Sequence, residues 1–271
     1  GMTTLLNNAY RTWQLPMGIF AQSIGIAMLP SLSAHHAAGE TDAFRQMFNR
    51  GMRAVFLISL PLSFILLAEG EQIMRLLFKW GGSPEADVFY SGAALMGYSV
   101  ALLCASLVGM TIRAFYAMHD SVTPLMAGLA GIAMNYLFNA LFRHYAQIGI
   151  AGTSLAYSIS AFLQMMVLLL LFSRKTGFPF FSDNIRVFGR SLVAMVPSAP
   201  VLWGLTLLLR PNPDSKLSQL VCATVPAVGC LAMYYFAARR LHIAEVSLLR
   251  DMIVNRLGGS RRRGGAASPR A

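Results

Sequence analysis

The chain has 271 residues and a formal net charge of +11, with 56% hydrophobic and only 12% charged residues. An ordinary soluble domain carries about twice that share of charged residues, and the mean hydropathy of this chain is +0.56. These values exclude a soluble globular domain. They indicate an all-α, polytopic membrane protein.

Apolar residues occur in seven blocks, most of them close to the length of about twenty residues that crosses a bilayer core as a helix. The predicted spans are residues 15–32, 52–67, 89–112, 122–142, 148–172, 191–209 and 217–238. Between the first two, Phe44, Met47 and Phe48 recur at helical spacing within residues 33–53. This pattern predicts an interfacial amphipathic helix, and we expect a second one after residue 242.

Basic residues decide the orientation, since short loops rich in Lys and Arg stay cytoplasmic. Alternate loops collect Arg45, Arg50, Arg53, Arg113, Arg174, Lys175, Arg186 and Arg190, together with the basic residues of the tail. The remaining loops hold fewer basic residues, diluted by acids such as Glu69, Glu71 and Glu85. We therefore expect a cytoplasmic C-terminus, and we interpret the positive charge as a topology signal, not as a sign of nucleic-acid binding. The tail is expected to lie on anionic membrane lipids.

The start of the chain has neither a basic leader nor a cleavage site within residues 1–8. The charge distribution places this start on the outer side of the membrane. Together these observations suggest that further spans precede Gly1. We expect the chain to be the C-terminal part of a longer protein.

No catalytic or metal site is predicted. His35 and His36 are adjacent, so their side chains diverge on a helix and cannot easily share one metal ion. His119 and Asp120 have no Ser, Cys or second acid at a spacing that would form a nucleophile system. The three cysteines fall in predicted spans and are interpreted as small apolar packing residues. An enzyme is therefore not expected.

Arg11 is the candidate binding residue. It lies at the threshold of the first span, and no Asp or Glu occurs from residue 1 to residue 39. An arginine at membrane depth is costly unless it meets a carboxylate, a water-filled cavity or an anionic ligand, and its planar guanidinium matches phosphate oxygens. Two interpretations stay open: Arg11 binds a phosphate-bearing substrate, or it extends into the lipid headgroup layer.

Other polar residues lie inside the spans. Asn135 and Asn139 are four residues apart on one helix face, and Thr153 and Ser154 lie on the next span. Interhelical hydrogen bonds are one explanation, and a hydrated cavity is the other. The oxygen atoms of these four residues are also candidate ligands for a monovalent cation such as Na⁺, although no carboxylate joins them.

Six short segments form a pattern that extends over about residues 8–175. They are residues 14–20 (QLPMGIF), 24–33 (IGIAMLPSLS), 75–78 (RLLF), 113–120 (RAFYAMHD), 123–124 (TP) and 149–156 (GIAGTSLA). In order and at matching spacing, these segments resemble those of the MurJ (MviN) lipid II flippases. The resemblance implies the fold of the multidrug/oligosaccharidyl-lipid/polysaccharide exporters, in which two lobes enclose a central cavity. Family members have fourteen helices, and this chain is similar to helices 8–14.

That resemblance implies three regions. Residues 1–173 are the core helices of the C-terminal lobe (family helices 8–12), residues 174–241 are the last two spans, and residues 242–271 are a cytoplasmic amphipathic helix and basic tail. By family role, Arg11 binds the pyrophosphate of the lipid-linked peptidoglycan precursor, lipid II, with Gln14 and Gln22 beside it.

The implied function is a bacterial inner-membrane transporter that moves lipid II to the outer leaflet by alternating access, in peptidoglycan biosynthesis. Its implied partners are lipid II and an N-terminal lobe. No cofactor is expected. Transport could be coupled to Na⁺ or to the membrane potential. An exporter of another lipid-linked saccharide or of a drug, and a membrane scaffold that transports nothing, are the alternatives.

Overall fold

The computed structural model describes residues 2–79, 84–146, 149–209, 216–241 and 243. Within these residues the chain is helical and has no β-strand, and seven of its helical runs are long and apolar enough to cross a membrane. The all-α fold and the seven predicted spans are therefore confirmed. The protein is a multi-pass membrane protein.

The first five runs come from the first two thirds of the chain. They are α1 (Met2–Pro16), a π-helical segment (Met17–Gln22), α2 (Ser23–Ala37), α3 (Thr41–Phe78), α4 (Glu85–Ala117), α5 (Val122–Leu141) with a second π-helical segment (Phe142–Ala146), and α6 (Ile150–Thr176). Then follow α7 (Phe180–Met195), α8 (Ser198–Leu208) and α9 (Lys216–Arg240). The first span combines α1, the π-helical segment and α2, and the sixth combines α7 and α8.

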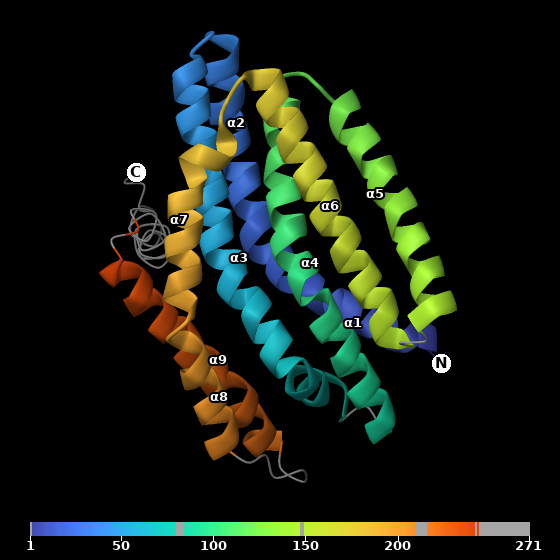
Figure 1. Ribbon diagram of the computed structural model, residues 1–271. Helices are drawn as coiled ribbons and strands as arrows, with labels where there is room; N and C mark the ends of the chain where they lie inside the picture. The colour runs from blue at the N-terminus through green and yellow to red at the C-terminus, as the bar shows by residue number, and fades with distance from the viewer. Residues whose placement is uncertain (1, 80–83, 147–148, 210–215, 242, 244–271) are drawn as a thin grey trace, which may run out of the picture.

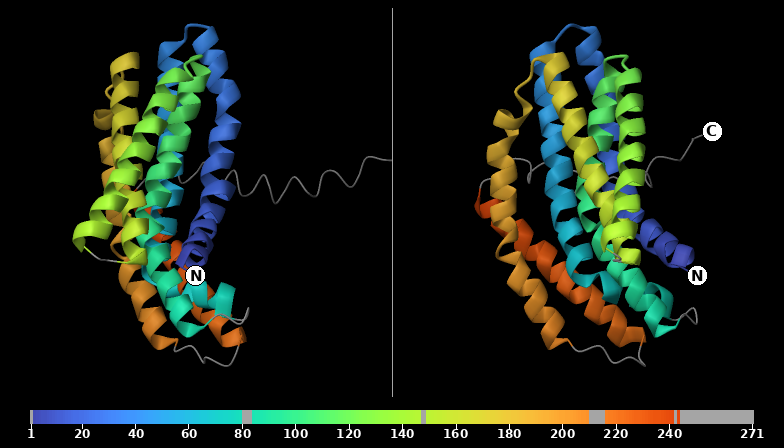
Figure 2. Two further views of the ribbon diagram at one scale, coloured as in Figure 1. Left: turned by 90° about the vertical axis from the view of Figure 1, so that its right-hand side faces the viewer. Right: turned by 45° about the vertical axis from the view of Figure 1, so that its right-hand side comes forward.

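The centre of the bundle is formed by α3, α4 and α6, with α4 packed against both of the others (Figure 1). On one flank, α5 covers α6. On the other, α7 and α9 contact α3, and α8 lies beside α9 (Figure 2). The core includes buried aromatic rings, among them Phe48 and Phe172, whose ring centroids are 4.2 Å apart, and Phe115.

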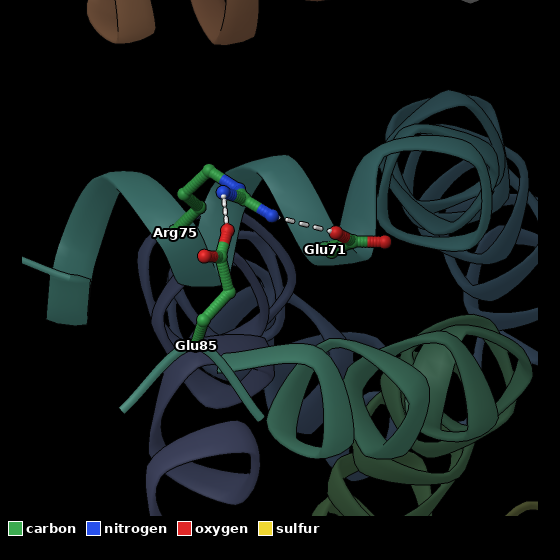
Figure 3. Close-up of polar contacts among 3 residues, drawn as sticks. All are labelled: Glu71, Arg75 and Glu85. Carbon is green, nitrogen blue, oxygen red and sulfur yellow. Dashed lines mark hydrogen bonds and ion pairs between the residues drawn. The ribbon is translucent and has the colours of Figure 1, made fainter. Parts of the chain in front are cut away.

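The connections alternate between the two ends of the bundle, as the count of basic residues requires. The turns that join α2 to α3, α4 to α5 and α6 to α7 lie together at one end, at the top of Figure 1. The last turn of α3 and the first turn of α4 lie toward the other end, where Arg75 donates hydrogen bonds to Glu71 and to Glu85 (Figure 3). Which end faces the cytoplasm stays a prediction.

Residues 33–53 do not form the separate interfacial helix that their amphipathic pattern predicts. They form the end of α2, a short turn and the first turns of α3, which runs on without interruption into the span. Phe44 and Phe48 are buried, at 3% and 1% exposure, and they pack against Phe178 and Phe172. An apolar face for the core and one for the lipid surface have the same periodicity, so the pattern alone could not distinguish them.

Three further expectations concern the sixth span, the tail and the cysteines. The sixth span is broken into α7 and α8 at Val196 and Pro197. The cytoplasmic helix and basic tail expected over residues 242–271 fall outside the described residues, apart from the buried Ile243. The three cysteines are free and buried, as small packing residues should be.

Candidate functional site

The helix α1 has two unlike faces. Ala9, Thr12 and Trp13 are buried, with Trp13 only 1% exposed. Asn7, Arg11 and Gln14, at positions i, i+4 and i+7 of the helix, are all exposed. This spacing puts three polar side chains in one row, which we call the polar stripe of α1. Asn7 was not singled out from the sequence, although its spacing from Arg11 could have identified it.

An aromatic cluster fixes which face of α1 is turned inward. Tyr10 and Trp13 of α1 pack with Tyr98 of α4 and Tyr157 of α6, with ring centroids between 5.6 and 6.1 Å apart. Aromatic pairs at such distances prefer defined relative orientations, so they resist rotation of the helix. The cluster therefore holds Arg11, which lies between Tyr10 and Thr12 in sequence, on the outside of the lobe.

Arg11 makes no hydrogen bond or ion pair with any residue that the structure describes. Its neighbour on the stripe, Gln14, is exposed as well. A guanidinium and an amide in a row on an apolar span cannot face hydrocarbon without a large cost. This face of α1 is suited to water, to an anionic ligand or to another polar protein surface.

Gln22 lies farther along the same span but in a different environment. The π-helical segment that precedes α2 changes the phase of the helix, and Gln22 turns toward α4, where its Oε1 accepts a hydrogen bond from Nη2 of Arg113. Nη1 of Arg113 donates to the carbonyl of Gly109 at 2.9 Å. The Arg113 side chain lies across Gly25, where an added Cβ would come within 2.7 Å of its Cδ.

The sequence-based placement of Arg113 in a cytoplasmic loop is therefore wrong. It belongs to α4, one turn before the helix ends at Ala117, and it is half-buried. A partner on the first span keeps this charge inside the lobe, and the count of basic residues had no way to reveal that partner. Arg113 of α4, bound to Gln22 of the first span, thus forms a second cationic position beside the span that carries Arg11.

The four candidate cation ligands are divided between two environments. Asn139 and Thr153 line one cavity of about 360 Å³ between the ends of α1, α5 and α6. The exposed Arg143 lines the same cavity, so a cation there would meet a like charge. Asn139 also donates to Asn135 of its own helix, at 2.9 Å to the backbone oxygen and 3.2 Å to Oδ1.

Ser154 points elsewhere. It is fully buried, its hydroxyl donates to the carbonyl of Ala151 at 3.0 Å, and its side chain packs against Gly97 of α4. The structure thus brings Asn139 and Thr153 together and separates Ser154 from them. Among the described residues, no cluster of His, Cys, Asp and Glu could hold a metal ion.

The turn between α4 and α5 is held by Asp120. Its carboxylate accepts hydrogen bonds from Nζ of Lys175 at 2.6 Å, from the Thr123 hydroxyl at 2.6 Å and from the Thr123 backbone N–H at 3.0 Å. The hydrogen bond from Lys175, followed by those from Thr123, lowers the pKa of Asp120 to about 2. Asp120 thereby caps the start of α5, the fourth span.

Comparison with known proteins decides the family. The family model "Lipid II flippase MurJ" matches residues 1–212, which is more than half of the chain. This chain belongs to the MurJ lipid II flippase family. A Vibrio cholerae relative, "Probable lipid II flippase MurJ", is 29% identical over 168 residues, covering 62% of this chain and 32% of the relative. A Rhizobium meliloti relative of the same description is 27% identical over 257 residues, covering 93% of this chain and 48% of the relative.

A solved structure supports the same fold. "Lipid II flippase MurJ, inward closed conformation" aligns with a TM-score of 0.67 at 22% identity, covering 87% of this chain and 47% of that chain. The chain thus spans roughly a third to a half of the length of the MurJ relatives it matches. The resemblance seen in the short motifs is confirmed by these comparisons.

Proposed function

We propose that this chain is the C-terminal lobe of a lipid II flippase and that the polar stripe of α1 is one wall of its transport cavity. The observation that carries the proposal is the exposure of Arg11, in a row with Asn7 and Gln14, on a helical run that is long and apolar enough to cross a membrane. A lobe that faced lipid on all sides would not keep an arginine there. A lobe that closes half of a cavity would.

The chemistry of Arg11 favours a diphosphate as the group that enters this cavity. A guanidinium keeps its charge at any physiological pH and binds phosphate oxygens with two parallel hydrogen bonds. Lipid II, named in the description of the family, carries a diphosphate between its lipid tail and its sugars. Gln14 can add an amide donor, whereas Gln22 is engaged with Arg113 in this conformation.

Transport would proceed by alternating access between this lobe and a second one, because a diphosphate headgroup cannot pass through hydrocarbon unaided. The cavity would accept lipid II from the inner leaflet, close, and open to the outer leaflet. This role in peptidoglycan biosynthesis places the protein in the bacterial inner membrane. We propose that the end with the α2–α3, α4–α5 and α6–α7 turns is cytoplasmic, together with the C-terminus, because that end is rich in basic residues.

Coupling to Na⁺ or to the membrane potential remains a proposal. Asn139 and Thr153 share a cavity and supply oxygen atoms, while Arg143 on the same wall opposes a cation. Transport that responds to the membrane potential but not to Na⁺ is therefore the outcome we expect.

The test is lipid II translocation in proteoliposomes that hold this chain together with an N-terminal lobe from a relative. Arg11→Ala should abolish translocation with normal membrane insertion, and Arg11→Lys should restore little of it, because an ammonium group lacks the paired donors. Arg190→Ala, at an exposed arginine of α7, is the matched control and should leave translocation unchanged. Full activity of Arg11→Ala would contradict the binding role and favour a lipid headgroup contact.

The alternatives give distinct results in the same assay. An exporter of another lipid-linked saccharide or of a drug would depend on Arg11 with its own substrate and would not move lipid II. A membrane scaffold would move neither, whichever lobe is added.

A further inference from the structure

Glu69 is a buried acid in the second half of α3, with 1% exposure. It is the residue of α3 that has non-helical backbone angles, φ −116° and ψ 16°, so the helix is kinked there. The sequence had placed it in an outer loop. Ionisable residues inside membrane spans are rare and usually mark a site for an ion, a proton or a substrate.

The hydrogen bonding of Glu69 fits a neutral carboxyl group. The hydroxyl of Thr206 on α8 has a single hydrogen, which it donates to the carbonyl of Leu202 at 2.7 Å. Its contact with Oε1 of Glu69 is longer, at 3.5 Å. The Thr206 oxygen is thus better placed to accept a hydrogen bond from a protonated Glu69 than to donate one to it. Oε2 of Glu69 has no hydrogen-bond partner among the described residues.

Within the part of the chain that the structure describes, no basic side chain forms a hydrogen bond or ion pair with Glu69. On α9, the buried thiol of Cys230 is close enough to interact electrostatically with the carboxyl group. On α4, backbone and apolar atoms close the space, since a Cβ on Gly70 would lie 2.8 Å from Met96 and 3.0 Å from the carbonyl of Gly92.

Two basic residues lie near Glu69 or Thr206 in the sequence. On α3 itself, Arg75 is bound by two carboxylates, those of Glu71 and Glu85 (Figure 3). Arg210 follows Thr206 by four residues and lies outside the described residues. The test below therefore includes it.

We propose that Glu69 is a proton-binding site, occupied when α8 and α9 pack on the kink of α3 and vacated when they separate from it. A carboxylate buried without a cation loses its hydration and gains little in return. The proton leaves most readily when water reaches the kink, which requires α8 and α9 to move away. Proton binding therefore favours the packed arrangement seen here, and proton release favours an opened one.

The site is distinct from the polar stripe of α1 and does not depend on the proposed substrate. It lies between α3 and the α8–α9 pair, so its proton would control how the last two spans dock on the core of the lobe.

Infrared spectroscopy of the whole chain in lipid nanodiscs tests protonation directly. At pH 7, exposed carboxyl groups are ionised, so a protonated carboxyl band must come from a buried acid. We expect this band in the wild type, its loss as the pH rises toward about 9, and its absence in Glu69→Gln. The control Glu71→Gln should retain the band. A wild-type spectrum without the band at pH 7 would overturn the proposal.

Thiol alkylation tests the coupling to α9. Two single-cysteine forms are compared, one retaining Cys230 beside Glu69 and one retaining Cys222, which is also buried on α9. The ratio of their N-ethylmaleimide rates cancels the common rise of thiolate with pH. We expect the ratio to increase about threefold or more between about pH 6 and about pH 9, following the release of the Glu69 proton, and to stay flat in Glu69→Gln.

Each remaining outcome decides the question. The same pH dependence of the ratio in the wild type and in Glu69→Gln would show that the proton does not control docking. A band that is absent from the wild type at pH 7 but appears in Arg210→Gln would indicate an ion pair in place of a proton site. An unchanged band in Arg210→Gln supports the proton site.

Discussion

Gly97→Ala should loosen the contact between α4 and α6. An added Cβ at Gly97 would lie 2.8 Å from the Ser154 Cβ, closer still to its hydroxyl, and 3.3 Å from the backbone nitrogen of Leu155. The two helices are tied at this level, because the Ser158 hydroxyl donates to the Gly97 carbonyl at 2.6 Å and accepts from the Ala101 N–H at 3.1 Å. The methyl group therefore forces Ser154 to rotate or the helices to separate.

The size of the effect follows from three contributions. Overpacking of a tight contact costs about 1–3 kcal/mol, and rotation of Ser154 forfeits one hydrogen bond worth about 1 kcal/mol. Alanine returns about 1 kcal/mol through its higher helix propensity. The net loss is about 2 kcal/mol, which for a chain of this size lowers the melting temperature by about 4–8 °C. Thermal unfolding in detergent, followed by the fluorescence of the tryptophans, measures it.

Two further variants make this result decisive. Gly128→Ala on α5 is the matched control, since nothing lies within 4 Å of a Cβ there, and it should be neutral or slightly stabilising. Gly97→Ala combined with Ser154→Gly moves the small residue to the facing helix and should recover most of the loss. If Gly97→Ala melts like Gly128→Ala, the packing role of Ser154 is refuted and its role as a cation ligand is open again.

Three other predictions concern the turn, the second cationic position and the lobe. The pKa of Asp120 is lowered to about 2 from 3.8, so the stability that the Asp120 carboxylate contributes is complete above pH 3.8 and is lost as the pH falls toward 2. Asp120→Asn should therefore melt at a lower temperature than the wild type at pH 7. A difference in melting temperature that did not shrink below about pH 4 would contradict this. Gln22→Ala removes an acceptor from the half-buried Arg113 and should cost about 1.5–3 kcal/mol, whereas Gln14→Ala, at an exposed position, should cost little in the same melt. In vesicles, this chain alone should not translocate lipid II and should do so with an N-terminal lobe; activity of the chain alone would point to a pair of identical lobes.

The number and order of the spans could be predicted because length and apolar composition are enough to define a helix in a bilayer. The helix ends could not. The first turns of α3 were interpreted as interfacial because the sequence does not say whether Phe44 and Phe48 face lipid headgroups or the rings of Phe172 and Phe178. Only the three-dimensional neighbours decide this.

The charged residues of the lobe could likewise be predicted only in part. Arg11 could be singled out as a candidate because an arginine without a local acid at the start of an apolar span requires a partner. Arg113 and Glu69 were both assigned to loops, since near the end of a span one helical turn separates a charge in water from a charge inside the bundle. Gln22 and Thr206, the residues that contact them, are distant in sequence.

Arg113 and Glu69, which were both predicted to lie in loops, differ from Arg11 in their surroundings within the lobe. Arg113 has a partner on the first span, and Glu69 is enclosed by α8 and α9, so the lobe itself determines the state of both. Arg11 is held outward by the Tyr10–Trp13 aromatic cluster and has no described partner. A lobe that keeps an arginine without a described partner facing outward on a rigid support is suited to receive an anion from outside itself. We therefore propose that the binding role belongs to α1, whereas Gln22 and Ser154 contact neighbouring helices.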